Sequence, residues 1–229
     1  MTGQPKPDLL FVTLIHQALR ADAERLVAAT SALQAGDTQR LTGLRGFFDE
    51  YRGQLCLHHG HEDELFFPAL QAVVEESQAP IAELARQHGT LESDLQAVGD
   101  GLASLDTASG DFAAAHTDVA SSMTEMAKHL DAHLAVEEET VLPIMASAVP
   151  HASHKQLEDQ ARKLTPRRRA QFLIPWIVGH ATPDQRRELF RSAPPLRAAY
   201  LVNRHRYRRL DRALLVTPSA SHSQHALGR

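Results

Sequence analysis

Two segments of the sequence repeat one spacing of histidine, glutamate and proline. The first, HHGHEDELFFP, begins at His58, and the second, HLAVEEETVLP, begins at His133. In each, a glutamate stands four residues after that histidine and a proline stands ten residues after it. Residues four apart lie on one face of an α-helix, one turn along. The repeat therefore predicts two helices that each direct one His/Glu pair, His58 with Glu62 and His133 with Glu137, at a common site.

Imidazole and carboxylate together suit iron, manganese or zinc. Both predicted pairs also lie on apolar helical faces, since Leu55 precedes His58 and Leu130 precedes His133 at helical spacing. A charged pair that faces a core costs free energy unless something such as a metal ion compensates it. The pairs are therefore candidate metal ligands.

Two further histidines, His16 and His88, each lie in the middle of the apolar face of another predicted helix. A single histidine in such a place is more often a hydrogen-bonded core residue than a ligand. The two repeated pairs change this interpretation, because four helices then offer ligands to one site. The predicted metal ligands are His16, His58, Glu62, His88, His133 and Glu137.

The carboxylates that follow the preferred glutamates leave an alternative open. Asp63 and Glu138 each come one position later, and either could be the true bridging ligand. His129 precedes His133 by four residues, so it could replace a ligand or hydrogen-bond one.

Two other side chains lie near the predicted site. His59 flanks the ligand face, which favours contact with solvent or a hydrogen bond to a ligand. Tyr51 lies two turns before His58 on the same face, where packing is its simplest role.

Four amphipathic segments must position these residues. They run from Pro7-Asp8 to Gly36-Asp37, from about Thr38 to Glu76, from Pro80 to the turn at 106–110, and from near Asp111 to Pro150. Long helices joined by short turns pack as antiparallel neighbours, and such bundles build metal sites from inward-facing residues. The predicted fold is all-α: an antiparallel up-down-up-down four-helix bundle with additional C-terminal helices.

The charge of the 229-residue chain divides it into unequal parts. Residues 1–160 hold 9 Lys+Arg and 25 Asp+Glu, or −16, whereas residues 161–229 hold 15 and 3, or +12, which sum to the net charge of −4. We therefore predict a bundle over 1–150, a basic helical extension over 151–216 and a disordered tail over 217–229. Within the extension, Thr165-Pro166 and Thr182-Pro183 predict helix starts.

The basic extension has two interpretations. The simpler is that its cations pack against the acidic bundle. The alternative is a nucleic-acid partner for Arg167–Arg169 and the arginines of 204–212, although no recognised binding motif supports it. The chain lacks both a membrane-length apolar span and a signal-peptide pattern, and its lone Cys56 favours a reducing compartment, so we expect a cytoplasmic protein.

The two quoted segments, with His16 and His88, resemble the hemerythrin-like family, also described by its HHE cation-binding motif. The resemblance covers roughly the first 150 residues, and basic extensions of this type resemble those of some bacterial members. The resemblance implies a four-helix bundle with a non-haem di-iron centre, in which the carboxylates of Glu62 and Glu137 bridge two iron ions. It also implies that this centre interacts with dioxygen, hydrogen peroxide or nitric oxide. Manganese or zinc remains an alternative.

One departure from the family bears on activity. Oxygen-carrying hemerythrins place two histidines four apart on the third helix, whereas His88 has Leu84 and Glu92 at those spacings. One imidazole is therefore missing or replaced by Glu92. Fewer imidazoles leave more positions for water or substrate, which favours peroxide removal or dioxygen-dependent oxidation at the metal over reversible binding, storage or sensing.

Overall fold

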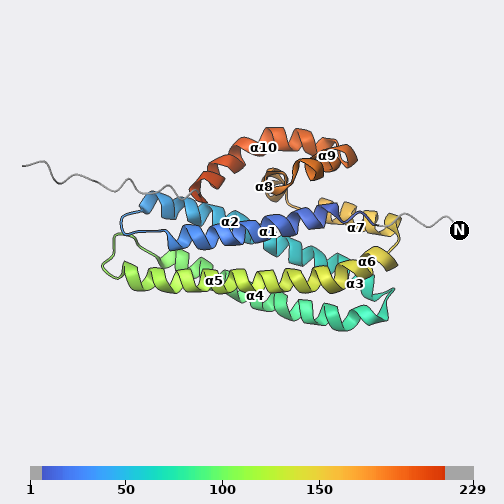
Figure 1. Ribbon diagram of the computed structural model, residues 1–229, viewed down its shortest axis with the longest axis horizontal. Coiled ribbons are helices and arrows are strands. Elements are labelled where there is room, and N and C mark those ends of the chain that lie inside the picture. Colours follow the sequence, from blue (N-terminus) through green and yellow to red (C-terminus); the bar gives the residue numbers. More distant parts are fainter. Residues whose placement is uncertain (1–6, 215–229) are drawn as a thin grey trace, which may run out of the picture.

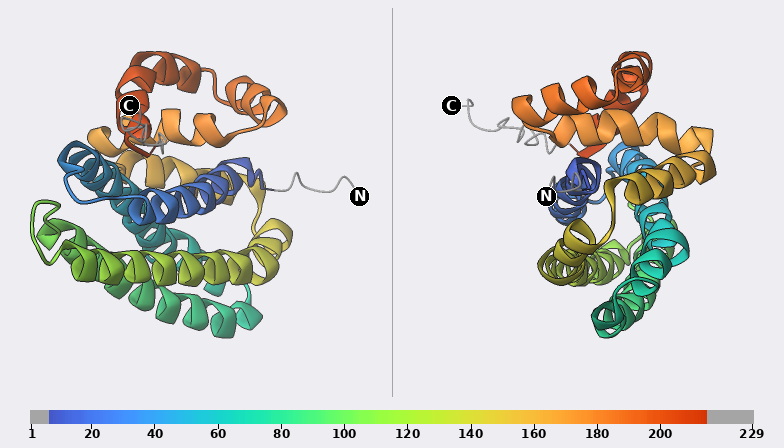
Figure 2. Two further views of the ribbon diagram at one scale, coloured as in Figure 1. Left: turned by 60° about the vertical axis from the view of Figure 1, so that its left-hand side comes forward. Right: turned by 90° about the vertical axis from the view of Figure 1, so that its right-hand side faces the viewer.

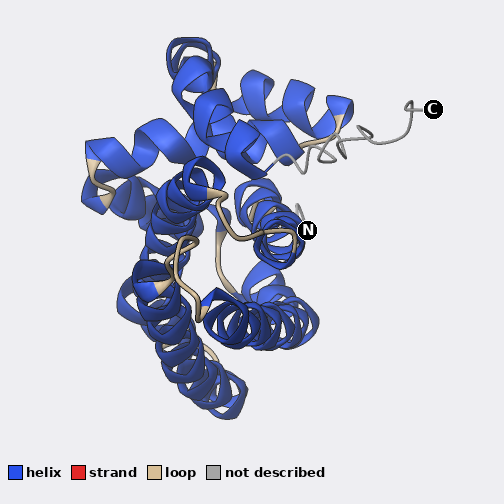
Figure 3. Ribbon diagram, turned by 90° about the vertical axis from the view of Figure 1, so that its left-hand side faces the viewer, coloured by secondary structure: helices blue, strands red, loops and turns tan. Residues whose placement is uncertain are grey.

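A computed structural model describes residues 7–214, so the predicted disordered tail at 217–229 lies outside the described residues. Throughout the described range the regular elements are helices, with no strand (Figure 3). None of these helices is long and apolar enough to cross a membrane.

Four long helices form the bundle: α1 (Leu10–Ser31), α2 (Thr38–His61), α4 (Gln78–Ser104) and α5 (Phe112–Val136). They lie side by side along the long axis of the molecule (Figure 1). Helix α1 packs on α5, α5 on α4, α4 on α2, and α2 on α1. The predicted all-α bundle with extra C-terminal helices is confirmed.

The sequence sets the bundle by burying one face of each helix. In α4, for example, Leu84, His88, Leu91 and Leu95 recur at helical spacing and are all buried. The turn between α1 and α2 uses Gly36 at φ +87°, a left-handed conformation that favours glycine. The helix itself ends at Ser31, before the predicted stop at Gly36-Asp37, and Gly36 lies in the turn that follows.

Two of the long helices continue past a change of winding. Helix α2 passes through a π-helical turn, Glu62–Phe66, into α3 (Phe67–Gln71), and α5 passes through a second one, Glu137–Val141, into α6 (Leu142–Ala148). Between α3 and α4 lies a short 3-10 turn, Glu75–Ser77.

The C-terminal part of the described chain is also helical. It comprises α7 (His151–Leu164), α8 (Arg167–His180), α9 (Pro183–Ser192), α10 (Pro195–Asp211) and a final 3-10 turn, Arg212–Leu214. Helix α8 packs on α1 and α2, and α10 packs on α8 (Figure 2). The extension therefore lies along one side of the bundle.

Apolar contacts join α8 to the bundle. Phe172 meets Phe47 edge to face, and Trp176 meets Tyr51 in the same way. Trp176 is fully buried, and these side chains belong to one core cluster that runs from the bundle into the extension. Aromatic burial of this kind contributes more to docking than exposed ion pairs do.

Charged contacts accompany the apolar ones. Glu50 of α2 is buried, and its carboxylate lies 3.1 Å from Arg169, 3.0 Å from Arg206 and 3.4 Å from Arg168. A buried carboxylate needs such partners. Three arginines of the extension thus surround one carboxylate of the bundle, next to an apolar interface that the charge pattern did not indicate.

The two helix starts expected in the extension are capped differently in the structure. At α9 the predicted start is present, and Thr182 and Gln185 form a capping box. The Gln185 N–H donates to the Thr182 hydroxyl at 3.3 Å, and the Thr182 N–H donates to the Gln185 side chain at 2.8 Å. At α8 the helix begins after Pro166, next to the predicted start, but Thr165 does not cap it: the Thr165 hydroxyl donates to the Ala161 carbonyl at 2.8 Å.

The fully buried Asp22 of α1 yields a test of the docking. Its carboxylate accepts hydrogen bonds from Trp176 Nε1 at 2.7 Å and from Arg25 at 2.6 Å. Removing it leaves buried donors without an acceptor, so Asp22→Ala should lower the free energy of unfolding by about 2–4 kcal/mol in chemical denaturation. The exposed Glu24 on the same helix is the control, and Glu24→Ala should change the free energy of unfolding by less than about 0.5 kcal/mol. Equal effects would mean that Asp22 is not a docking residue.

Candidate metal centre

The two repeated segments occupy the places where the long helices change to π-helical winding. Each π turn begins on the glutamate of the repeat: the Phe67 N–H donates to the Glu62 carbonyl, and the Leu142 N–H donates to the Glu137 carbonyl. A proline follows each donor, and proline has no N–H and clashes with the carbonyl four residues earlier in an α-helix. The proline of the repeat therefore accounts for the wider turn, a feature frequent at functional sites.

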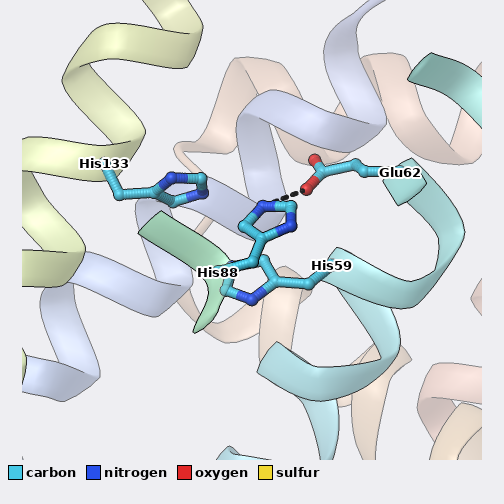
Figure 4. A group of neighbouring side chains, drawn as sticks. All are labelled: His59, Glu62, His88 and His133. Atoms are coloured by element: carbon cyan, nitrogen blue, oxygen red, sulfur yellow. Dashed lines mark ion pairs between the residues drawn. The ribbon is translucent and has the colours of Figure 1, made fainter. Parts of the chain in front are cut away.

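One group of four potential ligands comes from four elements. His59 lies on α2, Glu62 begins the π turn, His88 lies on α4 and His133 lies on α5 (Figure 4). One ligand atom from each lies within 4.8 Å of the others, and all four residues are buried. His88 Nε2 is 3.5 Å from Glu62 Oε2.

A second group of four adjoins the first. It consists of His16 of α1, His58 of α2, Glu62 and Glu137, again with ligand atoms within 4.8 Å of one another. His58 Nε2 lies 3.2 Å from Glu62 Oε1, and His16 Nε2 lies 3.3 Å from Glu137 Oε2. The two oxygens of Glu62 thus face different groups, as a carboxylate bridging two metal ions requires.

Several ligand atoms in these groups lack any hydrogen-bond partner. They are His59 Nε2, His88 Nε2, His133 Nε2, Glu62 Oε2 and Glu137 Oε2, and each is buried. A buried polar atom without a partner costs about 1–3 kcal/mol. Five such atoms converging on one place are accounted for by metal ions, which accept electron pairs from imidazole and carboxylate alike.

Comparison with known proteins agrees with this donor set. The family model described as the hemerythrin HHE cation-binding domain matches residues 11–145, which contain every side chain of both groups. The chain belongs to the hemerythrin HHE cation-binding family. No curated protein and no solved structure matches it significantly. Family membership and the two buried groups together make this chain a metal-binding protein.

His59 is the ligand candidate that the sequence analysis placed wrongly with respect to solvent. It is buried in the first group and stacks on His88, with ring centroids 3.9 Å apart. Glu62 follows His58 by four residues and His59 by three, and both spacings make neighbours on a helix. The adjacent pair His58-His59 was the signal that could have found it, because one glutamate can serve both.

This hemerythrin-family site therefore has five imidazoles, not four. Glu92 is exposed and belongs to neither group, so it does not replace an imidazole. His59 of α2 supplies the additional imidazole. Glu137 was expected to bridge the two metal ions together with Glu62. In the structure only Glu62 belongs to both groups, whereas Glu137 belongs to the second alone.

The outer ring nitrogens of three histidines are held by side chains around the site. His16 Nδ1 lies 2.9 Å from Glu138, His88 Nδ1 lies 3.0 Å from Asp63, and His133 Nδ1 lies 3.2 Å from Gln87. Such contacts orient Nε2 of a ligand histidine toward the metal and raise its basicity. Asp63 and Glu138, the alternative bridging carboxylates, lie here on the outer side of the rings.

Glu138 is itself fixed by Arg20, whose two terminal nitrogens donate to its two oxygens at 2.7 and 3.0 Å. Arg20 also donates to Asp131 at 2.8 Å. The contact with His16 and the one with Arg20 lower the pKa of Glu138 to about 2, against a smaller opposing effect of burial. Glu138 therefore stays ionised and holds His16 in place.

In the site without metal, the pKa values of Glu62 and His16 are both raised. Burial, together with the negative charge of Glu137, raises the pKa of Glu62 well above its usual range. Burial opposes protonation of His16, but Glu137 and Glu138 outweigh it and raise the pKa of His16 to about 9. A metal ion entering this site must displace these protons.

Three other histidines of the site, His58, His59 and His133, stay neutral. Burial lowers the pKa of His58 and of His59, and neighbouring imidazoles lower both further. Burial also lowers the pKa of His133 to about 4. Neutral imidazole is the form that binds metal, so these side chains are ready to act as ligands.

Two of the remaining candidates lie outside both groups. Tyr51 donates its hydroxyl to the Leu19 carbonyl at 3.1 Å and packs on Trp176. The His129 side chain is 47% exposed, and its Nδ1 lies 2.6 Å from Asp94 Oδ2. Neither residue is placed to bind a metal ion.

The two-group arrangement predicts a specific effect of His59. The protein expressed with iron should contain about two metal ions per chain, and His59→Ala should lower the content toward about one, because only the first group loses a ligand. The control is His129→Ala, which removes an imidazole outside both groups and should leave the content unchanged. Elemental analysis measures all three proteins. Full metal content in His59→Ala would remove His59 from the ligand set.

Proposed function

We propose that this chain holds a non-haem di-iron centre that reacts with dioxygen or hydrogen peroxide. The observation that carries the proposal is the pair of buried four-ligand groups sharing Glu62. His16, His58 and Glu137 would hold one iron ion, and His59, His88 and His133 the other. Manganese and zinc bind the same ligand types, so the metal content of the isolated protein tests the choice of iron.

Four protein ligands in each group leave room for a small exogenous ligand. Mixed histidine and carboxylate sites with open positions are typical of non-haem iron that binds dioxygen. Bound iron would supply the electron-transfer chemistry that amino-acid side chains lack. We propose no separate protein nucleophile, and the metal centre itself is the reactive group.

The surrounding residues support such a role by excluding water. Along α2, α4 and α5 the ligands separate two apolar clusters. One contains Leu55, Leu91 and Leu130, and the other contains Leu84 and Val141. A low-dielectric wall on both sides limits access to small molecules and strengthens electrostatic interactions inside the site.

Reversible binding of dioxygen or nitric oxide is the second candidate function. The case for turnover relied on a missing imidazole, and His59 supplies a fifth one. The imidazole count therefore favours a carrier or sensor as much as an enzyme. The two candidates share the same di-iron centre and differ in whether the bound ligand is released unchanged.

Peroxide consumption tests the first candidate. The iron-loaded protein should remove hydrogen peroxide faster than an equal amount of free iron, measured by loss of peroxide absorbance. His88→Ala should abolish this excess, because it removes one of the ligands that face Glu62. His129→Ala should retain it.

An oxygen-exposure experiment separates the candidates. The reduced protein is exposed to dioxygen, its spectrum is recorded, and the gas is then removed. A stable spectrum that reverses on removal, with negligible peroxide consumption, would contradict turnover and support reversible binding.

A further inference from the structure

A cavity of about 430 Å³ lies in the extension, away from the metal ligands. Residues of α8, α9 and α10 line it, and Arg25 of α1 completes it on the bundle side. The three extension helices are adjacent in Figure 1, with α8 nearest the bundle. Ligand pockets for small molecules occupy about 300–1,000 Å³, so the cavity has the size of such a site.

The lining of this cavity is strongly basic. Four arginines line it, and Asp211 is the only acidic residue of the lining. Arg25 lies 2.6 Å from both Asp22 and Asp211, which neutralise it. The other three are Arg186, Arg204 and Arg208. Among the described residues no carboxylate forms an ion pair with any of them.

Two of these guanidinium groups have buried donors without a partner. Arg186 Nε and Arg204 Nε are both buried and make no hydrogen bond within the described part of the chain. Arg186 uses another nitrogen to donate to the Ala181 carbonyl at 3.2 Å. Like charges gathered round a cavity destabilise the empty protein, and a bound anion would relieve that repulsion.

The remaining lining suits the organic part of a ligand. Tyr200 and Tyr207 contribute aromatic rings, and Pro175 and Val178 contribute apolar surface. The planar guanidinium groups of neighbouring arginines match the geometry of a phosphate. Aromatic rings beside them can stack on a flat group.

We propose that this cavity binds a small organic phosphate with a planar body, the chemistry of a mononucleotide. Arg186, Arg204 and Arg208 hold the phosphate, and Tyr200 with Tyr207 contact the planar body. The site is separate from the metal ligands, and its test does not require the proposed reaction of the metal centre. The volume of about 430 Å³ favours a small molecule over a nucleic-acid strand.

The test is isothermal titration calorimetry of the full-length protein with three probes: adenosine monophosphate, inorganic phosphate and adenosine. The monophosphate should bind most tightly, phosphate more weakly, and adenosine weakest. Adenosine binding as tightly as its monophosphate would overturn the anion site. Phosphate binding as tightly as the monophosphate would overturn the contact with a planar body.

Paired variants locate the site. Arg204→Gln should weaken binding of the monophosphate by about 10–100-fold, since hydrogen bonds to charged groups contribute about 1.5–3 kcal/mol. Arg209, exposed on the same helix and not in the cavity lining, is the matched control, and Arg209→Gln should change the affinity by less than about twofold. Iron can itself bind phosphate, so this comparison, rather than phosphate binding alone, assigns the site.

Stability supplies an independent measurement. Arg204→Gln should raise the melting temperature of the ligand-free protein while removing the increase caused by the monophosphate, because an uncompensated charge is lost with the ligand contact. A lowered melting temperature with unchanged binding would make Arg204 structural. If Arg204→Gln and Arg209→Gln lost equal affinity for the monophosphate, and a short single-stranded RNA bound more tightly than the monophosphate, a nucleic-acid surface would replace the proposed site.

Discussion

A buried carboxylate shared by two sets of histidines is the constraint on which this structure depends. Glu62 is 5% exposed and has His58 on one side and His88 on the other. Burying such a group without a positive partner is costly, and the raised pKa of Glu62 expresses that cost. The bundle tolerates it because apolar clusters on both sides hold the four helices in place.

The contacts around the ligands continue this constraint outward. His16 is held by Glu138, and Glu138 is held by Arg20, so a ligand candidate of α1 is oriented by a residue within the π turn that follows α5. Six residues after His16, Asp22 binds Trp176 of α8. Helix α1 therefore joins the metal site and the C-terminal extension within about two turns of one rigid element.

The sequence predicted the bundle because its signals are local. Apolar residues at helical spacing, the turn at Gly36 and the repeated His/Glu pairs each depend on a few neighbouring residues. The same periodicity brought His16, His58, Glu62, His88, His133 and Glu137 to one place.

What the sequence could not predict depends on geometry between helices or on departures from ideal winding. His59 lies about 100° round the helix from His58, so periodicity alone assigned it to the flank. It enters the site because α4 approaches α2 closely enough for His59 to stack on His88. The docking of Trp176 on Tyr51 and the cavity of α8 to α10 likewise require the positions of elements distant in sequence.

The bridging role proposed for Glu62 is tested most directly by a crystal structure of the iron-loaded protein with anomalous diffraction measured at the iron edge. The account predicts two peaks about 3.5–4 Å apart, each contacting a different oxygen of Glu62. One peak should lie beside His59, His88 and His133, and the other beside His16 and His58. A single peak, or two peaks of which one makes no contact with Glu62, would contradict it.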